Sequence, residues 1–323
     1  MFKIGVYKGL QWAILNATVV NDVVYEGGPC VHALLEQIVK HSRICMADPL
    51  ASLVATMVQE NRTWNKRTRF QDIANGNTPF FCSIHHYSDF KSRHPSLVEN
   101  SSYLVLLGTG NFSLIKSESI LDEYFFTDEQ LFGGVSPSRH YSSSSQKVLF
   151  PFSIMADLRE QGLLHLGVAT GVLQTSLGLD DSSPIPTPPT LKSTFQFQIV
   201  NPHNEELFEF NGQIEVDLLI FGEVDGKATL FVIEGKLNSV PSTIAKTKLA
   251  YASMAIISSG KVPRNVNVVP VYVKTEYRKA DNSFHYFVSQ FEMSAKSREG
   301  ALELSEFKVI PNKSRHFFIK DLY

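Results

Sequence analysis

The chain has 323 residues, of which 43% are hydrophobic and 19% are charged, and its formal net charge at pH 7 is −2. This composition is typical of a globular protein, excludes a disordered chain, and provides enough residues for two domains with a core each. The net charge is the strongest compositional objection to a nucleic-acid partner, because phosphate binding normally leaves a basic footprint, although the local field of a cleft can still attract phosphate.

Membrane and metal-cluster classes are also disfavoured by the sequence. No apolar run is long enough to cross a bilayer, and the first residues lead to no convincing cleavage site, so we expect no membrane association and a cytoplasmic location. Three scattered cysteines are too few for a disulfide framework or a four-cysteine zinc site, and we expect them to be reduced.

The amino-terminal part predicts helices followed by a β-hairpin. Apolar stripes at helical spacing predict helices over residues 31–39 and 49–58, and strands are predicted over 103–107 and 111–116 on either side of Gly108-Thr109-Gly110. That glycine pair lacks both a third glycine and a Gly-Lys-Ser/Thr ending, so we expect no nucleotide cofactor.

Helices followed by a hairpin are compatible with a winged helix-turn-helix, which would make this part a DNA-recognition domain. Basic residues gather in the segment between the helices and the hairpin, where a DNA-contacting patch is one interpretation and a solvated charge run is the other. The residues of this candidate patch are Arg62, Lys66, Arg67 and Arg69.

A proline-rich segment, 182–190, cannot continue a helix or a central strand and predicts an extended connector. We therefore expect a recognition domain over 1–180, a connector over 181–192 and a second domain over 193–323. Residues 155–179 have helical apolar content interrupted by glycines, and if they precede the following sheet, the domain border lies nearer Val148.

The most informative segment runs from Asn211 to Asn238. Residues 214–221 and 228–233 are apolar enough for buried strands, and Asp225-Gly226 supplies the positive φ of a tight hairpin turn. Alternation along a strand places Glu215 and Asp217 on one face of the first strand, and Glu234 and Lys236 on one face of the second.

Three carboxylates and a lysine in an apolar sheet repel one another and lose hydration unless a cation compensates them. Oxygen ligands with water left in the coordination shell are typical of Mg²⁺, for which Mn²⁺ can substitute. The alternative is that Asp217 and Glu234 are exposed strand-end residues and that Lys236 forms an ordinary cross-strand ion pair.

The residues that follow complete a mixed arrangement. A helix is predicted over 242–259 and ends at Gly260, and strands are predicted over 265–274 and 283–292. Lys246 and Lys248 lie on the helix, where they either approach a nucleic-acid phosphate or belong to a solvated face.

The Asp217…Glu234-Gly235-Lys236 pattern resembles the PD-(D/E)xK nuclease superfamily over about the last 130 residues. The resemblance implies an α/β (α+β) fold with an αβββαβ core around a mixed sheet, with Asp217 and Glu234 binding the metal and Lys236 closing the motif. Val216 stands where many members have proline, and Glu215 is an extra acid that either takes a catalytic part or accepts a hydrogen bond.

The same resemblance implies a Mg²⁺-dependent DNA endonuclease, most similar to type II restriction enzymes, with double-stranded DNA as its partner. Cutting both strands with one site per chain generally needs two chains, so a homodimer is expected. The alternatives are a repair, resolvase or mobile-element nuclease that acts with a partner, and a DNA-binding protein without catalytic activity.

Overall fold

In the computed structural model, the described residues form two compact units, which we treat separately. The structure describes residues 64–65, 89–93, 95–108, 111–142, 146–154, 158–179, 194–201, 207–237 and 243–320. Several predicted features lie outside these residues: the helices over 31–39 and 49–58, the connector over 182–190, and Arg62, Lys66, Arg67 and Arg69.

The smaller unit contains the predicted hairpin. Its strands β2 (Ser102–Gly108) and β3 (Asn111–Lys116) are neighbours in a sheet with β1 (Trp64–Asn65), which confirms the hairpin, and α5 (Pro95–Glu99) precedes it. Tyr103 and Val105 are buried on one face of β2 because alternate side chains of a strand share a face.

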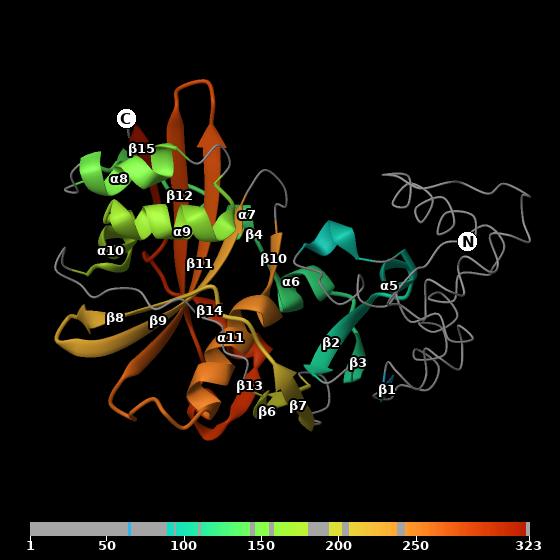
Figure 1. The fold of residues 1–323 in the computed structure, drawn as a ribbon. Helices are drawn as coiled ribbons and strands as arrows, with labels where there is room; N and C mark the ends of the chain where they lie inside the picture. Colours follow the sequence, from blue (N-terminus) through green and yellow to red (C-terminus); the bar gives the residue numbers. More distant parts are fainter. Residues whose placement is uncertain are drawn as a thin grey trace, which may run out of the picture. The chain divides into compact units, whose positions relative to one another are not determined.

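The larger unit is built on a mixed sheet. Within the described part of the chain this sheet has seven strands, in the order β5-β15-β12-β11-β9-β8, with β14 paired to β12 (Figure 1). The bounds of its strands are β5 Pro137–Arg139, β8 Leu218–Val224, β9 Lys227–Leu237, β11 Asn267–Arg278, β12 Ser283–Glu292, β14 Lys308–Val309 and β15 Arg315–Lys320.

Strands β8 and β9 form the predicted antiparallel hairpin. Asp225 and Gly226 have φ values of 53° and 74°, which are the positive angles that a tight turn between twisted strands requires. The first strand, however, begins at Leu218 rather than at residue 214. The preceding strand, β7 (Leu207–Gln213), pairs in a separate sheet, so residues 214–217 carry the chain from one sheet to the other.

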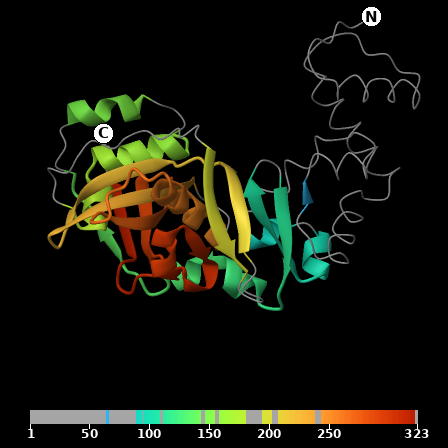
Figure 2. The same ribbon diagram turned by 90° about the horizontal axis from the view of Figure 1, so that it is seen from below.

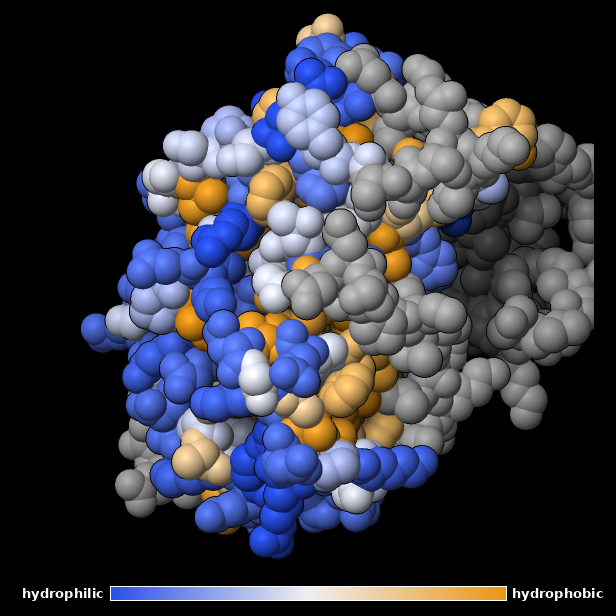
Figure 3. Space-filling model, turned by 90° about the vertical axis from the view of Figure 1, so that its left-hand side faces the viewer, coloured by the Kyte–Doolittle hydropathy of each residue, from blue (hydrophilic) through white to orange (hydrophobic). Residues whose placement is uncertain are grey.

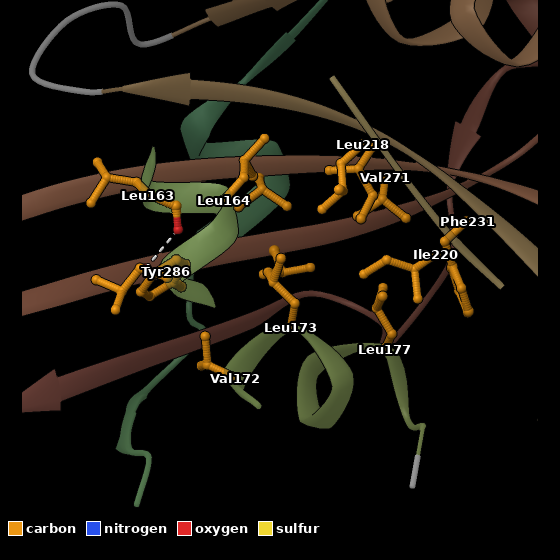
Figure 4. Packing of buried hydrophobic residues seen from close by; sticks show 14 of the residues in the cluster. Leu163, Leu164, Val172, Leu173, Leu177, Leu218, Ile220, Phe231, Val271 and Tyr286 are labelled. Atoms are coloured by element: carbon orange, nitrogen blue, oxygen red, sulfur yellow. Dashed lines mark hydrogen bonds between the residues drawn. The ribbon is translucent and has the colours of Figure 1, made fainter. Parts of the chain in front are cut away.

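Helices α9 (Glu160–Ala169) and α10 (Val172–Leu177) cover one face of this sheet, and Gly171, at φ 80°, separates them. Their leucines pack against apolar residues of β8, β9 and β11, among them Leu218, Ile220, Phe231 and Val271 (Figure 4). The buried Tyr286 hydroxyl donates to the Leu163 carbonyl oxygen at 2.9 Å, which fixes α9 to β12. Both helices therefore belong with the sheet, although they precede the proline-rich segment.

Helix α11 (Lys246–Ser258) connects the parallel strands β9 and β11. It contacts both strands, yet none of its residues enters the cluster under α9 and α10, so it covers the opposite face. The predicted helix and the two strands after it are confirmed. The helix starts four residues late, because Thr243–Ala245 (β10) pairs with β4 (Phe125–Thr127).

A second, three-stranded sheet in the order β13-β6-β7 packs beside α11 (Figure 2). Phe197 and Phe210 stack at 4.6 Å between ring centroids, and both meet Tyr251 of α11 edge-on. The bounds of the remaining elements are α6 Ile120–Tyr124, α7 Asp128–Phe132, α8 Gln146–Ser153, β6 Thr194–Val200, β7 Leu207–Gln213 and β13 Ala301–Glu303, with 3₁₀ turns at Phe90–Ser92, Ala295–Glu299 and Leu304–Glu306.

The described chain is thus a mixed α+β structure whose sheets combine parallel and antiparallel strands. Figure 3 shows one face of the molecule, on which hydrophilic residues cover much of the surface and hydrophobic residues gather in smaller patches. Among the residues that the structure describes, no helix is long and apolar enough to span a membrane.

Candidate active site

The candidate site lies where β9 continues beyond its hairpin partner. Strand β8 pairs with β9 only as far as Leu218 opposite Ile233, so on this side residues 234–237 have no strand partner among the described residues. Two carboxylates instead accept hydrogen bonds from the backbone amides of this segment. The Asp217 Oδ2 atom accepts a hydrogen bond from the Gly235 amide at 2.8 Å, and Glu160 Oε2 accepts one from the Leu237 amide at 3.3 Å.

Glu234 is the buried member of the group, with 7% of its surface exposed. Burial raises the pKa of its carboxyl from 4.5 to about 7; Lys236 opposes this rise and Asp217 adds to it. A carboxylate at this position therefore needs more positive charge than Lys236 alone supplies.

Lys236 links the acids to one another. Its Nζ atom lies 3.0 Å from Glu234 Oε1 and 3.2 Å from Glu160 Oε1, and it donates to the Gly235 carbonyl oxygen at 2.7 Å. Burial by itself would lower the pKa of Lys236, but the charges of Glu234 and Glu160 outweigh burial and raise it. The side chain therefore carries a firmly held positive charge.

The structure adds Glu160 to the predicted set. This residue is the first of α9 and stands 76 positions before Lys236. An acid in the first turn of a helix is common because it complements the helix dipole, so its position in the sequence gave no signal of a role in the site. Only the packing of α9 on the sheet brings it to β9.

Gly235 allows α9 to come this close. A Cβ atom at this position would stand 2.8 Å from Leu164 Cδ1 and 3.3 Å from Glu160 Cγ. A side chain at the middle position of the motif would therefore require the Leu164 and Glu160 side chains of α9 to shift.

Gly235→Ala is accordingly expected to destabilise the fold by about 1–3 kcal/mol, the usual range for an overpacked core position. It should also weaken the contact between Glu160 and Lys236. Chemical denaturation measures the first effect. A thermal shift on adding Mg²⁺, compared with that of the wild type, measures the second, and an unchanged stability would contradict the close approach of α9.

The charges of the group fit a divalent cation. The group contains three carboxylates, of Asp217, Glu234 and Glu160, and one ammonium group, of Lys236. When all four are ionised, two negative charges are not compensated. Among the described residues, no group of three or more Cys, His, Asp or Glu side chains is already arranged around a metal position. A site with two carboxylates suits Mg²⁺, since this ion keeps several waters and usually takes one or two protein carboxylates.

Of the other predicted residues, Glu215 and Lys246 lie apart from this group, and Lys248 reaches it only through its charge. Glu215 is exposed, and among the described residues no hydrogen bond or ion pair joins it to Asp217, Glu234 or Lys236. Lys246 is 7% exposed, donates to the Asp122 carbonyl oxygen at 2.9 Å and lies over the Phe126 ring, so its ammonium group is directed into the protein. Lys248 is half-buried, and its charge reaches Glu234.

Comparisons of the chain with protein-family models, with curated proteins and with solved structures give no match. The geometry of the site is therefore the basis for its function.

Proposed function

We propose that this protein is a Mg²⁺-dependent endonuclease that hydrolyses phosphodiester bonds of double-stranded DNA. The observation that carries the proposal is the convergence of Asp217, Glu234 and Lys236 at the open end of β9, with an excess of negative charge for a cation to balance. Mn²⁺ is expected to substitute for Mg²⁺, because both ions favour oxygen ligands.

The order of the elements supports the same proposal. Helix α9, strands β7, β8 and β9, helix α11 and strand β11 occur in the order of the αβββαβ core of PD-(D/E)xK nucleases, with α10 and β6 inserted before β7 and β10 inserted before α11. Asp217 stands immediately before the second strand and Glu234 near the end of the third, which is the arrangement of the motif. The first strand differs, since β7 pairs with β6 and not with β8.

Each residue has a distinct task in this proposal. Asp217 and Glu234 would hold the cation, and when bound it would polarise the scissile phosphate and activate the attacking water. Lys236, held by two carboxylates, places a positive charge where negative charge develops in the transition state. Glu160 positions Lys236 and completes the hydrogen bonding of the β9 edge.

The proposal is tested by incubating the purified chain with supercoiled plasmid in Mg²⁺, in Mn²⁺ and in EDTA. Cleavage that depends on the ion is expected, and no cleavage in either ion would count against the proposal. Discrete fragments would support a type II restriction enzyme, whereas nicking or smearing would favour a repair, resolvase or mobile-element nuclease. Binding without cleavage would indicate the inactive DNA-binding protein.

The oligomeric state has its own measurement. A restriction enzyme that cuts both strands at a palindromic site is expected to be a homodimer, because two sites must act on antiparallel strands. Sedimentation of the chain with and without a duplex measures this directly, and a monomer on DNA would favour nicking.

A further inference from the structure

A second lysine lies beside Lys236 on the neighbouring strand. Lys274 of β11 pairs in register with Lys236 of β9, and Tyr272 pairs with Glu234 in the same way. In-register residues of parallel strands point to the same face, and the strands are about 4.8 Å apart. Lys274 therefore stands on the face of the sheet that carries Glu234 and Lys236.

The ammonium group of Lys274 is held by a carboxylate from a third element. It forms an ion pair and hydrogen bond with Asp128 Oδ2, and 13% of the Lys274 side chain and 30% of the Asp128 side chain are exposed. Asp128 is the first residue of α7, whose start is fixed by a capping box between Thr127 and Gln130. The carboxylate is thus held in place rather than carried on a loose loop.

The environment of Tyr272 indicates that Asp128 lies near the carboxylates of the candidate site. Only 1% of this tyrosine is exposed, and burial raises its pKa, with further contributions from the charges of Asp128, Glu234 and Glu160. The phenol therefore lies within electrostatic reach of all three carboxylates. Asp128 brings a fourth carboxylate into this neighbourhood, and Lys274 compensates its charge.

The Asp128 carboxylate carries a negative charge, as a phosphate of a nucleic-acid substrate does. Carboxylate and phosphate oxygens bind an ammonium group through the same charge-assisted hydrogen bonds. The pair is only partly buried, so an incoming anion can reach the lysine without unfolding its surroundings. When a phosphate replaces the Asp128 carboxylate at Lys274, the charge of the lysine stays compensated. The Asp128 carboxylate is then hydrated by water.

We propose that Lys274 forms a second phosphate-binding subsite beside Lys236, in which Asp128 occupies the anion position until a nucleic-acid phosphate displaces it. This inference rests on the proposed function, since it takes the substrate to be a phosphodiester chain. The phosphate concerned is a neighbour of the one that is cleaved. Asp128 thereby weakens the binding of nucleic acid in general.

The test uses two variants with opposite expected effects. Fluorescence anisotropy measures the affinity of the full chain for a 30-base-pair duplex and for a 30-nucleotide single strand, in EDTA and at several salt concentrations. Lys274→Ala should weaken binding about 5-fold and reduce the slope of log K against log[salt] by about 1, because one phosphate contact is lost. Asp128→Asn should strengthen binding several-fold, because the competing anion is removed.

Two further variants separate this effect from general damage. Lys274→Arg keeps the positive charge and should retain the wild-type salt slope. Lys308→Ala removes an ordinary surface ion pair, with Glu306 at 3.1 Å, in which both side chains are well exposed. It should leave affinity and slope unchanged.

The outcomes distinguish this subsite from the nuclease proposal. If Lys274→Ala and Asp128→Asn both weaken binding, or neither changes it, the pair is structural and the inference is overturned, whether or not plasmid is cut in Mg²⁺. Binding of neither probe by the wild-type chain overturns it too. Opposite effects without any cleavage would leave the subsite standing and count against the nuclease.

Discussion

Asp217→Asn is expected to reduce Mg²⁺-dependent cleavage of plasmid about a thousandfold. Asparagine is nearly isosteric and keeps an oxygen that can accept the hydrogen bond of the Gly235 amide, so β9 should keep its conformation. The negative charge is lost, and with it one of the two carboxylates that would hold the cation. A thousandfold loss corresponds to about 4 kcal/mol of transition-state stabilisation, a magnitude ordinary for metal-assisted hydrolysis.

The matched control is Glu215→Gln, which removes a negative charge two residues away on an exposed side chain. We expect this variant to keep its activity within a few-fold of the wild type, because no contact of the described residues ties Glu215 to the site. Initial rates and circular dichroism of both variants are compared. Asp217→Asn with more than a tenth of wild-type activity would remove Asp217 from the site.

Glu234 is expected to make stability depend on pH when no divalent cation is present. Between pH 4.5 and about 7 the folded protein keeps a proton on Glu234 that the unfolded chain has lost, so the free energy of unfolding falls as pH rises through this window. The difference in pKa corresponds to a loss on the order of 3 kcal/mol, fully expressed above pH 7. The thermal midpoint of the larger unit should therefore be roughly 5–10 °C lower above pH 7 than below pH 4.5 on account of Glu234.

Glu234→Gln isolates this contribution, because it cannot ionise. The buried His316 acts in the opposite direction, since its pKa is lowered to about 4 by burial and by His285, but it is present in both proteins and cancels from their difference. Thermal melts of the two proteins at pH 5 and pH 8 are therefore compared. Mg²⁺ should recover stability of the wild type more at pH 8 than at pH 5, and have little effect on Glu234→Gln. If the thermal midpoints of the wild type and Glu234→Gln changed equally between pH 5 and pH 8, Glu234 would ionise freely and need no cation.

Local patterns predicted the elements of the larger unit well. The turn at Asp225-Gly226 is decided by two residues that accept positive φ, and the valine-rich strand before Arg278 and the strand from Ser283 to Glu292 are decided by their own composition. The late start of α11 had a distant partner as its cause. Residues 243–245 extend as β10 because they pair with β4, more than a hundred positions earlier.

In the candidate site, too, some residues could be predicted from local patterns and others could not. Asp217, Glu234 and Lys236 could be grouped from sequence alone, because a hairpin of known turn places residues of its two strands side by side and alternation then assigns their faces. The burial of Lys246 could not be foreseen. Its side chain turns toward Asp122 and Phe126, which reach α11 only when the chain is folded.

The sequence by itself determined the β8–β9 hairpin, the helix and strands after it, and three polar residues at one end of them. Only the tertiary structure brought Glu160 to Lys236 and Asp128 to Lys274, across 76 and 146 positions of the chain. The physical reason is that turn angles and side-chain alternation act between residues close in the chain. Contacts between distant residues depend instead on which faces pack together, here on α9 approaching a strand where glycine leaves no side chain in the way.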